Sequence, residues 1–280
     1  MSVIDAQVHA YDRHNPRRPW AGTLPGPPAL TGDDLVAAME NVGVDQALLV
    51  SPWSLYGSDT SYIIEVYGAH PGRFGLIAPI DPYEAKAADA VTTWGNTPGA
   101  VGIRLMAGVT EGFRSEHDEV RAAIAAAVAK ALPVCVFCPQ QLSLIDQLAR
   151  LYPDAQFVLD HLGLAQPLHP PPPEHPFADL DHVIGLAQHP NVAVKGLPVL
   201  CTLSSRPFPF DDLWEPLSRV FDSFGIDRCM WGTDWTRAVE LVDYAESVAA
   251  FRDHLPLSRG DRDALMGGTV EAIFGWPTRG

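Results

Sequence analysis

Short strand-like runs alternate with longer helix-like runs eight times along this chain. The candidate strands are residues 3–9, 44–51, 73–80, 99–105, 133–138, 155–161, 191–196 and 228–234. The candidate helices lie near 31–42, 59–69, 84–95, 116–130, 140–151, 177–188, 211–224, 240–254 and 259–274. Neighbouring parallel strands need a crossover, usually a helix, to return the chain. The series therefore predicts an α/β fold, a (β/α)8 TIM barrel. Because no linker divides it, we expect one domain over residues 1–280.

Three of the candidate strands carry titratable side chains at or near their ends. In residues 3–9, alternation places Asp5, Gln7 and His9 on one face, away from the apolar residues between them. Residues 157–161 end in His161, and residues 229–234 end in Asp234. Since strand C-termini converge on the catalytic face of a barrel, we expect His9, His161 and Asp234 to share one pocket. Each residue alone also has a structural interpretation, for example Asp234 as a helix N-cap.

Charge and composition exclude several classes of protein. The formal net charge is −15 and no Lys/Arg cluster occurs, which argues against nucleic-acid binding. Neither a signal peptide nor an apolar run of about 18 residues is visible, so we expect no membrane segment and a cytoplasmic location. Cys135 and Cys138 form a Cys-x-x-Cys pair, but they lie in a strand-like run, and we interpret all four cysteines as buried thiols.

Three cations and three aromatic residues near the predicted rim suggest how a substrate is held. Alternation directs Arg104 and Lys195 inward, and Arg237 follows the eighth strand. A buried arginine needs an anion, which is either a substrate carboxylate or a structural acid such as Asp81 or Asp5. We therefore predict a small anionic substrate, although a solvated loop charge is the simpler interpretation of Arg237.

The aromatic candidates for a substrate wall are Trp53 and Tyr56, just after the second strand, and Trp235, beside Asp234. Packing at the barrel rim is the alternative interpretation of all three. The chain has no Gly-x-Ser-x-Gly elbow and no phosphate-binding Gly-x-x-x-x-Gly-Lys motif, so serine-hydrolase and P-loop chemistry are not expected.

The motifs at the strand ends resemble those of the amidohydrolase-related family of the amidohydrolase superfamily. The resemblance rests on residues 5–9 (Asp-Ala-Gln-Val-His), 159–163 (Leu-Asp-His-Leu-Gly), 102–104 (Gly-Ile-Arg) and 230–235 (Met-Trp-Gly-Thr-Asp-Trp), and it spans essentially the whole chain in the expected order. The family includes small-molecule lactonases, such as those acting on 2-pyrone-4,6-dicarboxylate and on sugar lactones. The resemblance thus implies a barrel hydrolase.

The first-strand motif departs from the family pattern in a way that bears on metal binding. The family normally carries His-x-His there, and this chain has Gln7 in place of the first His. The fourth and fifth strands offer Arg104 and Cys138, and no Lys that could bridge two metal ions. Neutral Gln is a poor zinc ligand, so we expect no metal cofactor. If a metal ion is present, we expect one divalent ion, Zn or Mn, held by His9, His161 and Asp234.

The chemistry implied is attack of water on the carbonyl of a small, carboxylated lactone. Asp234 is the predicted general base, His9 and His161 orient it or polarise the carbonyl, and Gln7 donates to the developing oxyanion. Arg104 completes the predicted catalytic set. The alternatives are a mononuclear metal-dependent amidohydrolase, a non-oxidative decarboxylase of aromatic acids, and a non-catalytic barrel that only binds a small molecule. The sequence does not predict an oligomeric state.

Overall fold

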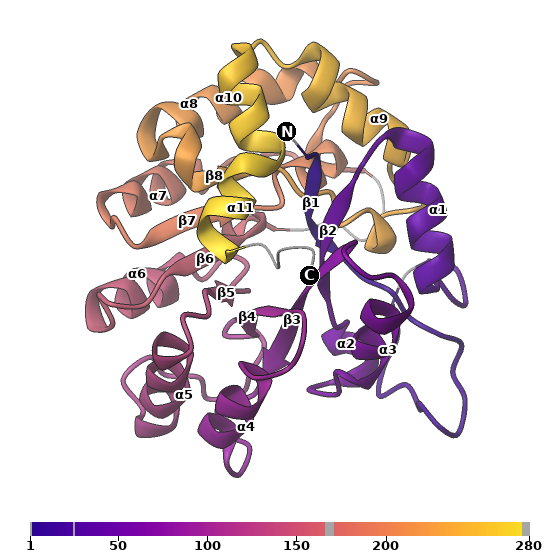
Figure 1. Cartoon of the computed structure of the whole chain (residues 1–280). Helices are drawn as coiled ribbons and strands as arrows, with labels where there is room; N and C mark the ends of the chain where they lie inside the picture. The colour runs from indigo at the N-terminus through magenta and orange to yellow at the C-terminus, as the bar shows by residue number, and fades with distance from the viewer. Residues whose placement is uncertain (1, 25, 166–170, 276–280) are drawn as a thin grey trace.

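Eight parallel strands form a single sheet in sequence order. The computed structural model describes residues 2–24, 26–165 and 171–275. The strands are β1 (Ile4–Val8), β2 (Gln46–Val50), β3 (Phe74–Ile80), β4 (Ala100–Leu105), β5 (Val134–Val136), β6 (Phe157–Asp160), β7 (Val192–Lys195) and β8 (Cys229–Met230). Helices surround the strands (Figure 1). The predicted (β/α)8 barrel is confirmed.

The end of β8 meets β1 and closes the barrel. The amide of Ala6 donates to the carbonyl oxygen of Trp231 at 3.0 Å, and the amide of Asp234 donates to that of Gln7 at 2.8 Å. The backbones are so close here that a Cβ added at Gly232 would lie 2.9 Å from the Gln7 nitrogen. Closure by these bonds fixes the backbone position of Asp234 relative to the first strand.

The helices match the predicted series with two differences. They are α1 (Gly32–Val42), α2 (Trp53–Tyr56), α3 (Ser61–Ala69), α4 (Ala87–Trp94), α5 (Asp118–Ala129), α6 (Leu142–Leu151), α7 (Leu180–Gly185), α8 (Trp214–Phe224), α9 (Tyr244–Ala249), α10 (Arg259–Asp263) and α11 (Thr269–Phe274). The short α2 was not predicted. The helix predicted over 259–274 is interrupted at Ala264–Gly268. Gly267 leaves helical geometry there, where a Cβ would lie 2.1 Å from the Ser2 carbonyl oxygen.

The barrel interior is plugged at one end and polar at the other. Inward side chains of the strands, among them Ile4, Leu48 and Val158, pack against Val270 and Phe274 of α11, which crosses in front of the strands in Figure 1. A larger apolar layer lies between the strands and the outer helices. With the strand N-termini sealed, the open end is the one at which TIM barrels carry their active sites.

A β-bulge in β1 corrects one expectation. Ile4 pairs with Gln46 and Asp5 with Ala47, but Val8 pairs with Leu49, so three steps of β1 face two of β2. Because Ile4 and Ala6 belong to the inner cluster, Asp5 points out of the barrel and does not share a face with Gln7 and His9. Its carboxylate accepts hydrogen bonds from Thr233, at 2.6 and 2.8 Å, and from Tyr244 at 3.1 Å.

The position of Asp5 predicts a pH dependence of stability. Burial raises its pKa from 3.8 to about 6, although the hydrogen bonds from Thr233 oppose the shift. The proton is therefore lost at lower pH in the unfolded chain than in the folded one. The contribution of Asp5 to stability is complete below pH 3.8 and is lost as the pH rises through about 6. A shift of two units corresponds to about 3 kcal/mol.

Asp5→Asn imitates the protonated carboxyl and should remove this loss. We compare the free energy of unfolding of the variant with that of wild type at the same pH. The variant's advantage should be about 3 kcal/mol larger at pH 7 than at pH 4. Urea denaturation of both proteins across this range measures the difference. A difference that stays constant with pH would show that Asp5 does not titrate in this window.

Candidate active site

A cavity of about 610 Å³ opens at the carboxyl ends of the strands. Its volume is in the range of small-molecule sites. The lining residues come from β1, β2, β4, β5, β6 and β8 or the segments that follow them: His9, Thr23, Leu24, Pro52, Trp53, Ser54, Arg104, Met106, Val109, Phe137, Pro139, Gln140, His161, Ala165, Asp234 and Arg237.

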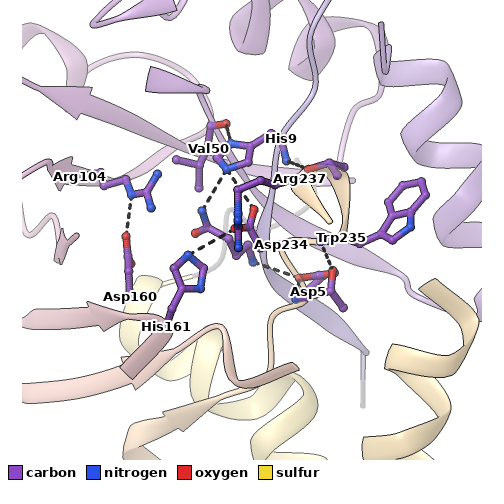
Figure 2. A network of polar contacts seen from close by, with 12 residues as sticks. Asp5, His9, Val50, Arg104, Asp160, His161, Asp234, Trp235 and Arg237 are labelled. Carbon is purple, nitrogen blue, oxygen red and sulfur yellow. Dashed lines mark hydrogen bonds and ion pairs between the residues drawn. The ribbon is translucent and has the colours of Figure 1, made fainter. Parts of the chain in front are cut away.

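Asp234 is the centre of the polar cluster in this cavity (Figure 2). Its Oδ1 lies 3.2 Å from His9 Nε2, and its Oδ2 lies 3.5 Å from His161 Nε2. The same Oδ2 accepts a hydrogen bond from Arg237 Nε at 2.8 Å. Asp234 and His161 both have left-handed backbones, with φ of 47° and 54°. Such strained conformations of non-glycine residues are concentrated at functional sites.

The surroundings of Asp234 keep its carboxyl ionised. Burial by itself would raise the pKa, but the positive surroundings, chiefly the charge of Arg237, outweigh it and hold the pKa well below the usual range. Asp234 is 1% exposed. The cluster thus presents a buried carboxylate to the cavity at neutral pH, as a general base requires.

His9 is fixed by hydrogen bonds on both sides. Its Nδ1 donates to the Val50 carbonyl oxygen at 2.7 Å, and its backbone amide donates to Thr236 Oγ1 at 2.9 Å. Because a carbonyl can only accept, Nδ1 carries hydrogen and Nε2 is the atom that meets Asp234. The side-chain amide nitrogen of Gln7 lies 3.3 Å from the same Nε2.

His161 is a neutral imidazole. Burial lowers its pKa to about 3, even though the charges of Asp234 and Asp160 favour the protonated form. A Cβ added at Gly196 would lie 2.5 Å from His161 Nδ1, so the backbone of β7's end packs directly on the ring. His161 can therefore orient Asp234 through Nε2 without adding a charge.

A chain of buried charges lies beneath the cavity. Arg104 Nε donates to Asp160 Oδ2 at 2.6 Å, and Lys195 Nζ lies 2.9 Å from Asp160 Oδ1. Lys195 also donates to Gln7 Oε1. Burial opposes ionisation of Asp160, but the charges of Lys195 and Arg104 hold its pKa well below the usual range. The protein anion that meets Arg104 is thus Asp160, and not Asp81 or Asp5.

The structure brings most of the predicted site residues together. His9, Arg104, His161, Asp234, Trp53 and Arg237 line the cavity, whereas Gln7, Lys195, Tyr56 and Trp235 do not. Gln7 and Lys195 are fully buried. The Tyr56 hydroxyl bonds the backbone of Asp12, and Trp235 stacks on Tyr244 at 4.8 Å, pointing away from Asp234 (Figure 2). Arg237 is not a solvated loop charge, since it pairs with Asp234.

Sequence reasoning missed Asp160, Phe137 and Met106. Asp160 pairs with Lys195 in the β6–β7 register, so opposite charges on inward positions of neighbouring strands were the available signal. Phe137 follows β5, and its ring lies under the Arg104 guanidinium at 5.0 Å. Met106 follows β4 and lines the cavity. Phe137 and Met106 are apolar, and an apolar residue in a sequence does not reveal whether it lines a cavity or packs in the core.

The side chains present do not suit a catalytic metal ion. Asp234 Oδ2 is already engaged by Arg237, and Gln7 Oε1 accepts from Lys195. The three cations of this network, those of Arg104, Lys195 and Arg237, exceed its two carboxylates, so a divalent ion would meet net positive charge. Among the described residues, no cluster of three or more His, Cys, Asp or Glu side chains has metal-binding geometry.

The four cysteines lie outside this chemistry. All four are free and buried, so the prediction of buried thiols is confirmed. Burial raises the pKa of Cys135 and Cys138 to about 12. Neither thiol is therefore a nucleophile at neutral pH.

Comparison with known proteins yields one family and one relative of related sequence. A family model described as amidohydrolase matches residues 4–276. The L-fucono-1,5-lactonase of Burkholderia ambifaria is 27% identical over 209 residues, which cover 72% of this chain and 68% of the relative.

Two solved structures illustrate the similarity of fold. A protein provisionally assigned as a 2-pyrone-4,6-dicarboxylic acid hydrolase, from Pseudomonas putida, superposes with a TM-score of 0.77 at 22% identity, covering 98% of this chain and 97% of that one. An amidohydrolase from Burkholderia multivorans with bound zinc gives a TM-score of 0.79 at 21% identity, covering 99% and 100%.

Proposed function

Because this chain belongs to the amidohydrolase family, we propose that it is a hydrolase that opens a small, carboxylated lactone. The observation that carries the proposal is the ionised Asp234, buried at a cavity that Arg104 also lines. The relative named as a fuconolactonase and the fold neighbour named as a pyrone dicarboxylate hydrolase support cyclic esters as the substrate class.

The proposed reaction is a water attack assisted by Asp234. The carboxylate takes one proton from the water, and the hydroxide oxygen bonds to the lactone carbonyl carbon. The ring C–O bond then breaks, and the proton passes to the leaving oxygen, which gives a hydroxy acid. His9 and His161 hold Asp234 in position at 3.2 and 3.5 Å. Gln7 lies beneath His9, so we assign it to orienting His9.

The low pKa of Asp234 favours an ester over an amide. A carboxylate stabilised by Arg237 is always ionised at neutral pH, but it is a weak base. A weak base suffices where the carbonyl is reactive and the leaving group is an alkoxide or enolate, and it is a poor match for expelling an amine. A lactone therefore suits this site better than the amide substrate of a mononuclear metal-dependent amidohydrolase.

We expect hydrolysis to be independent of added metal. Lys195 and Arg237 already donate to two of the oxygen atoms that a divalent ion could use, Gln7 Oε1 and Asp234 Oδ2. After treatment with a chelator and gel filtration, the protein should open carboxylated lactones at an unchanged rate. The rate is measured with a pH indicator, because each ester that is hydrolysed releases one proton. Elemental analysis of the same sample checks that zinc and manganese are gone. Activity that disappears and returns with either ion would contradict this expectation.

Two experiments address the remaining alternatives. A decarboxylase would release CO₂ from aromatic acids, and we expect none. A non-catalytic binding barrel would bind lactones without opening them, and we expect turnover.

We also infer a cytoplasmic location, supported by the four free thiols. No helix in the described ranges has both the length and the apolar character needed to cross a membrane.

A further inference from the structure

The wall of the cavity indicates the chemical nature of the substrate beyond its carboxylate. Half of the lining residues are apolar, and they follow β2, β4, β5 and β6 or lie between β1 and α1: Leu24, Pro52, Trp53, Met106, Val109, Phe137, Pro139 and Ala165. Of the reactive groups, His9, Asp234 and Arg237 follow β1 and β8, and His161 follows β6. A substrate with its carbonyl at Asp234 therefore lays the rest of its ring against apolar side chains.

Phe137 lies between Arg104 and His161. Its ring centroid lies 5.0 Å from the Arg104 guanidinium carbon, and 6.4 Å from the His161 ring in an edge-on arrangement. Among the described residues, neither terminal nitrogen of Arg104 makes a hydrogen bond, because the bond to Asp160 uses Nε. Arg104 is thus available to a carboxylate while His161 and Asp234 face the carbonyl. The surface between these two sites is aromatic.

Hydroxyl groups on the substrate would find few partners inside the cavity. Apart from the histidines and charged groups at the reactive centre and Arg104, the lining side chains able to bond a hydroxyl are Thr23, Ser54 and Gln140, and all three are exposed at the rim. A hydroxyl placed against Phe137 or Met106 would lose its bonds to water without gaining others, which is unfavourable. Even the rim includes an exposed apolar side chain, since Val109 is 55% exposed.

We propose that the substrate is a lactone with one carboxylate, bound by Arg104, and an otherwise apolar, unhydroxylated body, and that Trp53, Met106 and Phe137 determine this specificity. The inference rests on the proposed lactonase function and goes beyond it. It predicts that the protein discriminates against sugar lactones, including the fuconolactone in the name of the Burkholderia ambifaria relative.

The test compares two classes of anionic lactone. The apolar probes are coumarin-3-carboxylate and alkyl-substituted butyrolactone carboxylates, and the hydroxylated probes are D-glucaro-1,4-lactone and D-galactaro-1,4-lactone. We expect kcat/KM to be at least about tenfold higher for the better apolar probe than for either hydroxylated one, since one unsatisfied hydroxyl costs about that factor. Equal or higher kcat/KM for a hydroxylated probe would overturn the inference while leaving the lactonase function intact. Hydrolysis of none of the probes would overturn both.

Matched variants assign the specificity to the wall. Met106→Gln replaces the side chain by a polar one of nearly the same shape, and Met106→Leu keeps it apolar. The first should reduce the preference for the apolar probes by about tenfold, and the second should leave the preference unchanged. Trp53→Gln, at a half-buried position, gives a second measurement should Met106→Gln fold poorly. A preference that survives both polar variants would show that this wall does not select the substrate.

Discussion

Asp234→Asn should reduce kcat/KM for any accepted lactone by about 10³-fold or more, the largest effect expected of a single substitution here, because it removes the proposed base. Asparagine keeps the shape of the side chain and tolerates the left-handed backbone of this position, where φ is 47°. The variant should therefore fold, and thermal unfolding together with circular dichroism checks that it does. Activity is measured by proton release with saturating and limiting lactone.

Asp146→Asn is the matched control for this substitution. Like Asp234, Asp146 pairs with histidine and arginine side chains, here His189 at 2.8 Å and Arg150 at 3.1 Å, and it does not line the cavity. The same chemical change there should leave kcat/KM close to that of wild type. Asp234→Asn with activity within about tenfold of wild type would exclude Asp234 as the base, and attention would turn to His9.

The sequence contains enough information to predict the barrel because its signals are local and repeated. Each strand-like run is followed by a helix-like run, and parallel strands have few other ways to connect. Boundaries were less predictable where long-range packing decides them. The helix expected over 259–274 is interrupted because Gly267 packs on Ser2, a contact between opposite ends of the chain.

The site was predictable where a titratable residue stands at or shortly after a strand end, as for His9, His161 and Asp234. Alternation gave the wrong face for Asp5, because a β-bulge in β1 shifts the alternation of side chains between the two faces. No residue type in that strand indicates a bulge. The partners of the buried cations were also hidden. Asp160 and Lys195 are 35 positions apart and meet only through the β6–β7 register, so a list of inward residues does not reveal the pairing.

Arg104→Lys should lower kcat/KM for a carboxylated lactone by about 100-fold, the second largest effect expected here, since hydrogen bonds to charged groups contribute about 1.5–3 kcal/mol. The arginine bonds Asp160 through Nε and keeps its terminal nitrogens for a ligand. A lysine has one nitrogen for both tasks, and the buried Asp160 should retain it. Arg104→Met is less informative, because leaving Asp160 with Lys195 alone destabilises the fold.

The methyl ester of the same lactone provides the control, because it has no carboxylate for Arg104 to bind. Wild type and Arg104→Lys should hydrolyse the ring of this ester at similar kcat/KM. The two proteins and the two substrates then form a cycle in which the substitution lowers kcat/KM only for the substrate that carries the carboxylate. A similar loss for the acid and the ester would mean that Arg104 acts through Asp160 on the shape of the cavity and not on the substrate. Since Arg104 and Asp234 are tested through different substrate groups, the carboxylate and the carbonyl, one assignment can be wrong without the other.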